Sequence, residues 1–428
     1  MGLIREKTVG NWQLIARLDQ IETDRHGRTV LLFDAIRDDL IDWPRPEWGK
    51  IFGDDAPEAR KAFALVRAMP DDTAFAALSE RVRPHEGQWF WLELAPDAST
   101  GAMPCEYAAL GENGYSQHIQ GFISGLDLLI DEETAPQPRP LGASVPTNKQ
   151  KGQAVKSAAA FPAAAPSFSR IGCPPQRWHF SATKITVRDV GQAAFVTLDL
   201  DLHWPSAVGN NHFNLRVPLH YDAGWPVSFH DDTAPLPQTL NVQPGIVVLS
   251  HWDWDHMHGF YRFAALPDSS WIAPDRPMGP GAGRVAQYLH KHQRLWRFDR
   301  KRLRLPWICI LTANGPPKDA NQSGLAMVVK LADGRRALLT GDADYARLPS
   351  PFATDDYDFI VATHHGARFA GHVVTPAAPG CRAVISAGLG NYYGHPTLRA
   401  MLAHARAKWQ LEATFERKKQ PRGDREWP

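Results

Sequence analysis

Residues 245–256 read GIVVLSHWDWDH, an apolar run followed at once by four residues that can bind metal ions. A short apolar run that ends in polar residues is typical of a buried strand. We expect His251, Asp253 and Asp255 to alternate at the mouth of this strand and to point to one side, while His256 reaches the same space from the next turn. Because His and Asp are common ligands of divalent ions, the stretch predicts a metal site.

The composition is that of an ordinary globular chain. Its 428 residues are 43% hydrophobic and 22% charged, and 47 basic against 46 acidic side chains give a net charge of +1, which excludes a general basic coat for nucleic acid. The four cysteines show no CxxC pair, no stretch reaches the roughly 18 apolar residues of a membrane-spanning helix, and the N-terminus is charged where a secretion signal is apolar. We therefore expect a cytoplasmic protein with no membrane partner.

The chain is predicted to hold two domains and a linker. Residues 133–175 are rich in Pro, Ala and Ser, which is typical of a linker. Residues 1–132 are predicted to form a small α+β or β-rich domain with a partner-binding or regulatory role, and residues 176–428 predict β-sheets flanked by helices. In the N-terminal domain we expect strands at 29–33 and 89–94 and helices at 56–69 and 74–82.

The pattern HxDxDH after an apolar strand resembles the second motif of the metallo-β-lactamase fold. Other segments resemble the ComEC-type branch of that family in the same chain order, across about residues 183–409. They are Asp189-Val190-Gly191-Gln192, Asp222-Ala223-Gly224, Asn321-Gln322-Ser323, Leu338-Leu339-Thr340-Gly341-Asp342, His364-His365-Gly366 and Asn391-Tyr392-Tyr393-Gly394-His395-Pro396. The resemblance implies an α/β fold of four layers, αββα, a hydrolase activity and two divalent metal ions.

The sequence also departs from the family pattern. Ala193-Ala194 stands where the family has an acidic turn, Met257-His258 where it favours glycine, and Ala367 where it has a serine. The many membrane helices of that branch are missing. These changes leave the metal-binding residues in place, but they prevent the family's substrate from being carried over.

The metal ligands can be assigned from residue type and order. His251 and Asp253 are expected to bind one ion, Asp255 and His256 the other, and Asp342 to bridge the two. Asp253 makes the first site richer in oxygen than an all-histidine pocket, which favours Mn²⁺, with Zn²⁺ or iron as the alternatives.

The remaining site residues follow later strands. His364, His365 and His395 each come after an apolar run; we favour His365 and His395 as ligands or proton donors, with His364 as a close competitor. Asp255 is expected to position the attacking hydroxide, and a protonated His395 or His364 to supply the leaving-group proton. Asp222 is expected to orient the ligand histidines.

A basic stretch follows the second motif. Aromatic residues Trp296 and Phe298 lie among its cations, as in surfaces that hold phosphates and stack bases. A solvated helix end followed by an amphipathic strand is the alternative. Asn321 and Ser323 are expected to line the pocket. The cations predicted to bind substrate are Lys291, Arg294, Arg297, Arg300 and Arg302.

The function predicted by these features is hydrolysis of phosphodiester bonds by a metal-activated hydroxide, with DNA or RNA as the substrate and partner. Two alternatives stay open. One is a small-molecule hydrolase that acts on a phosphocholine-type ester, a cyclic-nucleotide ester or a lactone. The other is a metal-stabilised interaction module without catalysis.

Overall fold

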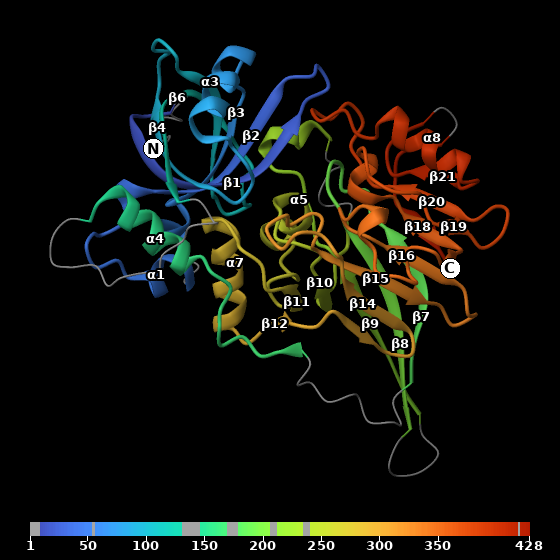
Figure 1. Ribbon diagram of the computed structural model, residues 1–428. Helices are drawn as coiled ribbons and strands as arrows, with labels where there is room; N and C mark the ends of the chain where they lie inside the picture. The colour runs from blue at the N-terminus through green and yellow to red at the C-terminus, as the bar shows by residue number, and fades with distance from the viewer. Residues whose placement is uncertain are drawn as a thin grey trace. The chain divides into compact units, whose positions relative to one another are not determined.

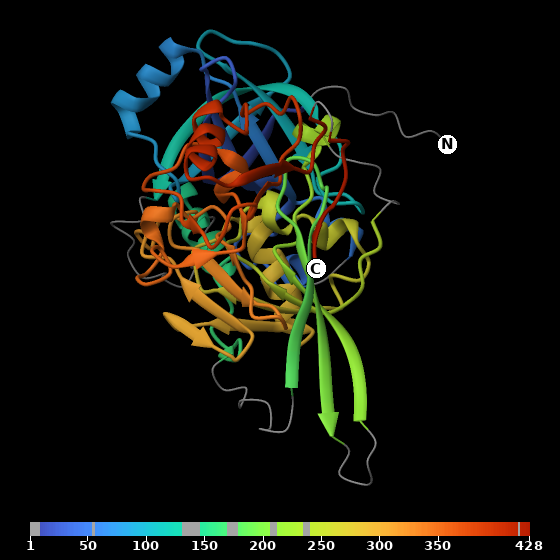
Figure 2. The same cartoon turned by 90° about the vertical axis from the view of Figure 1, so that its right-hand side faces the viewer.

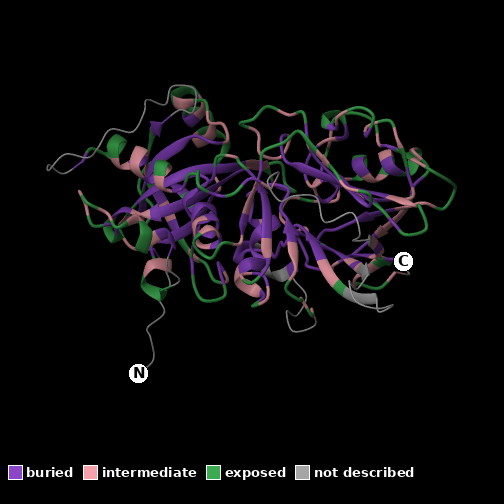
Figure 3. Cartoon of the chain, turned by 90° about the horizontal axis from the view of Figure 1, so that it is seen from below, coloured by how far each residue is buried: buried purple, intermediate pink, exposed green. Residues whose placement is uncertain are grey.

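The structure is a computed structural model that describes residues 9–53, 56–130, 146–168, 179–205, 212–233, 240–417 and 420–428. These residues divide into two compact units. The first takes in the described residues up to Ala163, together with Val227–Asp231 and Pro277–Gln293, and the second takes in Ala164–Pro226, Asp232–Arg276 and Arg294–Pro428. Each unit has an apolar core of its own, formed mainly by buried strand residues (Figure 3).

The first unit is built on a closed barrel of six antiparallel strands in the order β1-β2-β3-β5-β6-β4 (Figure 1). A closed barrel leaves no strand edge open to pairing with another chain. Residues such as Leu14, Phe33 and Phe90 are buried in its core. The strands are β1 Trp12–Thr23, β2 Thr29–Arg37, β3 Phe63–Ala68, β4 Trp89–Ala95, β5 Met103–Ala109 and β6 Ile119–Ile130.

The predicted strands at 29–33 and 89–94 lie in β2 and β4. The helix predicted over 56–69 is wrong in its second half, because Phe63–Ala68 form strand β3 with every residue buried. A short apolar run that is buried on both faces shows no period, so a strand and a helix look alike in the sequence.

The described residues of this unit also form the helices α1 Trp48–Gly53, α2 Pro57–Arg60, α3 Asp72–Val82, α4 Asn148–Ala158 and α7 Pro280–Lys291. The first turn of α7 is held by the buried Asp34 of β2, whose carboxylate accepts hydrogen bonds from Gly281 N at 2.8 Å and Ala282 N at 3.0 Å. A carboxylate at a helix N-terminus satisfies amides that lack partners within the helix. This contact explains why α7, far along the chain, belongs to the barrel unit.

The middle of the stretch predicted as a linker, residues 133–175, forms a helix. Helix α4 lies there, and it begins with a reciprocal cap in which the Thr147 and Gln150 side chains each bond the other's backbone amide. Its Gly152 and Val155 are buried. Residues 133–145 and 169–175 of the predicted linker lie outside the described residues, and the domain boundaries stay a prediction.

The second unit contains two seven-stranded sheets. The first sheet has the order β12-β11-β10-β9-β8-β7-β22. Its strands are β7 His179–Val187, β8 Val196–Pro205, β9 His212–Tyr221, β10 Ile246–Val248, β11 Ser270–Pro274, β12 Leu295–Phe298 and β22 Arg425–Trp427. The neighbours β7, β8 and β9 are its longest strands, and Figure 2 shows them extending side by side.

The second sheet has the order β13-β14-β15-β16-β18-β20-β21. Its strands are β13 Arg302–Arg304, β14 Ile308–Thr312, β15 Leu325–Lys330, β16 Arg336–Leu339, β18 Phe359–Val361, β20 Arg382–Ile385 and β21 Gln410–Ala413. A separate pair is formed by β17 Asp356–Tyr357 and β19 Thr375–Pro376, and the helices are α5 Trp254–Met257, α6 Gly259–Arg262 and α8 Leu398–Arg406.

One buried apolar cluster joins the two sheets. It contains Leu198 and Val248 from the first sheet and Ile310 and Met327 from the second. The unit is therefore a mixed α/β structure with two sheets around a common core, while the full four-layer order stays a prediction. Within the part of the chain that the structure describes, no helix combines the length and the apolar character needed to cross a membrane.

Candidate metal centre

The carboxyl ends of parallel strands bring the site residues together. Strands β9, β10 and β11 are parallel neighbours in one sheet, and β16, β18 and β20 are parallel neighbours in the other. Asp222 directly follows β9, while His251, Asp342 and His364 each lie three residues past the end of their own strands. Parallel strands end at the same edge of a sheet, which is why residues far apart in the sequence meet here.

The prediction that His251, Asp253 and Asp255 alternate at the end of β10 is wrong. β10 already ends at Val248, and helix α5 begins at Trp254. Asp255 and His256 therefore lie in the first turn of a helix, and Asp253 lies directly before it. The two Asp residues consequently point in different directions, although they are only two positions apart.

A first group of ligand atoms comes from His251, His256 and Asp342, and these atoms lie within 4.8 Å of one another. Asp342 Oδ1 is 3.1 Å from His256 Nε2, and Asp342 Oδ2 is 3.9 Å from His251 Nε2. All three side chains are buried. The two oxygens of Asp342 thus face different histidines.

A second group comes from Asp255, His256 and His365. His365 Nε2 is 3.0 Å from Asp255 Oδ2, and His256 Nε2 is 3.8 Å from Asp255 Oδ1. His256 belongs to both groups, so the geometry places it between two candidate ion positions. Asp253 lies 3.3 Å from His251 Nε2 but belongs to neither group, which differs from the predicted division of the ligands.

A left-handed turn directs the two adjacent histidines to different carboxylates. His364 has φ of 48° and His365 has φ of 53°, a backbone conformation that costs about 1–3 kcal/mol at a residue other than glycine. His364 Nε2 lies 3.3 Å from Asp342 Oδ2, whereas His365 faces Asp255. His365 Nδ1 donates to Ser386 O at 2.9 Å, which leaves Nε2 as the ligand atom.

Asp222 fixes the orientation of His256. Its Oδ2 accepts from His256 Nδ1 at 2.9 Å and its Oδ1 accepts from Ser250 N at 2.7 Å, with the Asp222 side chain fully buried. A proton held on Nδ1 leaves Nε2 of the same ring unprotonated and able to bind a metal. Ser250 makes the comparable contact for His251, with Oγ 2.9 Å from His251 Nδ1. The sequence motif did not single out Ser250, because serine has no ligand role of its own here.

The carboxylates make this centre attract positive charge. Burial alone lowers the pKa of His256, but the Asp342, Asp222 and Asp255 carboxylates raise that pKa well above its ordinary value. Burial raises the pKa of Asp342, but His256 and the other imidazoles outweigh it and hold that pKa well below its ordinary value. A divalent cation would supply the same compensating charge as these protons.

The donor atoms fit a bound ion. Buried atoms that have no hydrogen-bond partner among the described residues include Nε2 of His251, Nε2 of His256 and Oδ1 of Asp255. Unpartnered buried polar atoms are costly, and ions bound at the two ligand groups would supply partners for them. Two donors that are each about 2.1 Å from one ion lie about 3.4 Å apart in a tetrahedral arrangement, close to the 3.1 Å between His256 Nε2 and Asp342 Oδ1.

His395 lies beside these groups without joining them. Its ring centroid is 5.5 Å from that of His364, and its Nδ1 has no hydrogen-bond partner among the described residues. Burial, and after it the neighbouring His364, lowers the pKa of His395 to about 3. A neutral ring at this place fits a ligand better than a proton donor. The roles of His364 and His395 stay predictions.

The predicted substrate residues fall in several places. Lys291 lies in the first unit, while Arg294, Arg297, Arg300 and Arg302 lie in the second. Arg294 Nη1 bonds the Asp268 carboxylate at 2.6 Å, and Arg297 lies 3.6 Å from Asp275. The Asn321 side chain has a buried Oδ1 without a hydrogen-bond partner among the described residues. Substrate binding by these residues stays a prediction.

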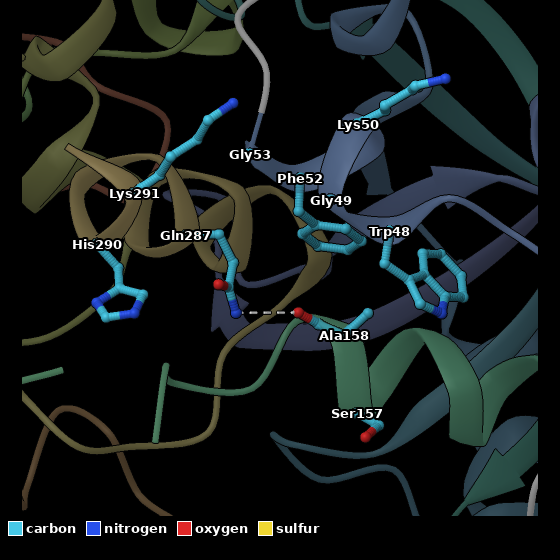
Figure 4. Close-up of a pocket in the computed structure, with 10 residues that line it drawn as sticks. All are labelled: Trp48, Gly49, Lys50, Phe52, Gly53, Ser157, Ala158, Gln287, His290 and Lys291. Atoms are coloured by element: carbon cyan, nitrogen blue, oxygen red, sulfur yellow. Dashed lines mark hydrogen bonds between the residues drawn. The ribbon is translucent and has the colours of Figure 1, made fainter. Parts of the chain in front are cut away.

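A cavity of about 600 Å³ in the first unit is separate from the candidate ligands. Trp48, Phe52, His290 and Lys291 are among the residues that line it (Figure 4). A smaller cavity of about 20 Å³ is lined by Asp222, Asp342, His364 and His365 among others. It offers room for about one water molecule beside the ligands.

The described residues thus define a mixed α/β protein with a candidate divalent-metal site at its strand ends. No protein-family model matches the sequence, and no curated protein matches it. Among solved structures, the chain is similar to metallo-β-lactamases from Cronobacter sakazakii (Enterobacter sakazakii) that are described by a HARLDQ motif. Two are mutants of that motif: both are 13% identical over 38% of this chain, covering 75% and 70% of their own lengths with TM-scores of 0.22 and 0.21.

A third structure carries the HARLDQ motif without a mutation in its description; it is 13% identical over 38% of this chain and 63% of its own length, with a TM-score of 0.21. Likenesses of this size carry no argument about this chain, so the interpretation of the site depends on the ligand geometry.

Proposed function

We propose that this chain is a metal-dependent hydrolase with a metallo-β-lactamase fold and that it cleaves phosphodiester bonds, as a nuclease on DNA or RNA. The observation that carries the proposal is the meeting of His251, His256 and Asp342 with Asp255 and His365 at the ends of parallel strands. Bound divalent ions would activate a water molecule and stabilise the negative charge of a displacement at phosphorus.

The residues divide this work by position. His251 and Asp342 are proposed to hold one ion, and Asp255 and His365 the other. His256 Nε2 lies within reach of both groups, and with its single lone pair it would bind one of the two ions. Asp222 keeps His256 in the tautomer that leaves Nε2 unprotonated, and the Ser250 hydroxyl holds the ring of His251 in place through Nδ1.

His364 is the proposed proton donor to the leaving group. Its side chain is 20% exposed, whereas that of His365 is only 2% exposed, so His364 is the one that a substrate can reach from solvent. Its Nε2 is close to Asp342 Oδ2, which would orient the ring towards the ions.

The test is metal content combined with a substrate panel. Purified protein is loaded with Mn²⁺ or Zn²⁺ and assayed on single-stranded DNA, double-stranded DNA, RNA and bis(p-nitrophenyl) phosphate. Asp342→Asn is expected to reduce turnover by at least about 100-fold, whereas Asp201→Asn, a surface carboxylate paired with Arg216, should leave it unchanged. Tight metal binding without cleavage of any of these diesters would contradict the proposal.

A further inference from the structure

Arg276 lies two residues past the end of β11, the parallel neighbour of the strand that leads to His251. It is half-buried, and the sequence motifs did not single it out. Its guanidinium bonds Ser323, with Nε 3.2 Å from Ser323 Oγ and Nη2 3.3 Å from Ser323 O. Residues 249–253, which join β10 to α5 and include His251 and Asp253, are called the ligand loop below.

Two contacts place Arg276 next to the ligand loop. Leu325, two residues past Ser323, donates its amide to Ser250 O at 2.8 Å, and Ser250 directly precedes His251. From the β11 side, Trp252 Nε1 donates to Pro274 O at 2.9 Å, two residues before Arg276. The guanidinium therefore lies beside the segment that carries the first ligands, without being a ligand itself.

Ser323 acts on Arg276 and has little capacity left for a substrate. It is 1% exposed, its Oγ donates to Asp319 O at 2.7 Å, and the same oxygen accepts from Arg276 Nε. The hydroxyl predicted to line the pocket holds the guanidinium in one orientation.

The guanidinium keeps donors for another acceptor. Of its five N–H groups, Nε–H and one on Nη2 bond Ser323, and one on Nη1 bonds Asp275 O at 3.3 Å. Among the residues that the structure describes, one N–H on each of Nη1 and Nη2 has no acceptor. Across the described ranges Arg276 forms no ion pair within 4 Å, and the Asp275 carboxylate lies 3.6 Å from Arg297. Burial lowers the pKa of Arg276, and the negative charge of Asp275 offsets part of that effect.

We propose that Arg276, held by Ser323, is the residue that selects an anionic substrate by binding a phosphate oxygen of the diester beside the metal ligands. The inference rests on the proposed function for the reaction, but it adds the group that recognises the substrate's charge. Arginine suits this role because its planar donors match phosphate oxygens two at a time.

The experiment compares Arg276→Gln and Arg276→Lys with the unaltered chain, and uses Arg335→Gln as the matched control, since Arg335 pairs with Asp333 in a surface turn. Two substrates with the same chromophore are assayed: bis(p-nitrophenyl) phosphate, an anion, and p-nitrophenyl acetate, a neutral ester. Binding of dimethyl phosphate to the Zn²⁺-loaded protein is measured separately by ³¹P NMR titration. Metal content and thermal unfolding confirm that each variant is folded and loaded.

Loss of a charge-assisted hydrogen bond predicts that Arg276→Gln lowers kcat/KM for the diester by about 10- to 100-fold, mainly through KM, and weakens dimethyl phosphate binding to a similar extent. The neutral ester should change by less than about 2-fold, and Arg276→Lys should recover part of the loss. Equal losses on both substrates, or unchanged dimethyl phosphate binding in a folded, metal-loaded Arg276→Gln, would overturn the inference. If dimethyl phosphate binds in an Arg276-dependent way while no diester is cleaved, the proposed function fails and the anion site stands.

Discussion

Asp222→Asn offers a direct measure of how far the surroundings of His256 determine metal binding. Asp222 and His256 are both fully buried and joined by the 2.9 Å bond from Nδ1 to Oδ2. Asparagine has nearly the same shape, and it tolerates the left-handed backbone of Asp222, whose φ is 57°. The substitution therefore removes the negative charge and replaces one acceptor oxygen with a donor NH₂ group, and it leaves the fold in place.

The magnitude follows from the contacts. An asparagine amide cannot accept from Ser250 N and from His256 Nδ1 at once, because one of its two terminal atoms is a donor. If its NH₂ group faces His256, the ring must carry its proton on Nε2, the atom that would bind the metal. The loss of a buried charge-assisted bond, about 1.5–3 kcal/mol, predicts metal binding weaker by about 10- to 100-fold.

The assay is calorimetric titration of the metal-free protein with Zn²⁺ and with Mn²⁺. Asp201→Asn is the control, because Asp201 lies in the same sheet and its carboxylate pairs with the exposed Arg216. An Asp222→Asn protein that unfolds at the same temperature and binds metal within about 2-fold of the unaltered chain would show that Asp222 does not position His256.

Two further predictions concern packing and pH. A Cβ at Gly224 would lie 1.8 Å from Asp255 O and 2.7 Å from Ala194 O, so Gly224→Ala should lower the free energy of unfolding by about 1–3 kcal/mol. The control Gly49→Ala, with open space at that position, should change it by less than about 1 kcal/mol. Equal urea-unfolding midpoints for the two variants would refute this prediction. Burial lowers the pKa of His220 to about 4. The unfolded state therefore takes up the proton first, and stability should fall as the pH drops from about 6.5 towards 4. His220→Gln should remove about 2 kcal/mol of the stability difference between pH 7 and pH 5 in urea titrations, and an unchanged difference would mean that this ring titrates normally.

Much of the candidate site could be predicted from the sequence, because its ligands come in short motifs. The sequence of residues 251–256 pointed to a metal centre, and the structure places His251, Asp255 and His256 in its two ligand groups. Asp342 and His365 also lie in these groups. What the motif could not predict was the direction of each side chain, since β10 ends at Val248 and the chain turns into helix α5.

The sequence by itself determined which chemical groups are available, because residue type and local spacing are written in the chain. Only the tertiary structure decided which of them meet: Asp342 reaches His256 through the ends of strands in two different sheets, and His365 reaches Asp255 through a left-handed turn. It also decided that the guanidinium of Arg276 contacts the hydroxyl of Ser323. Pairing between distant strands depends on the whole apolar core, and no local pattern records it.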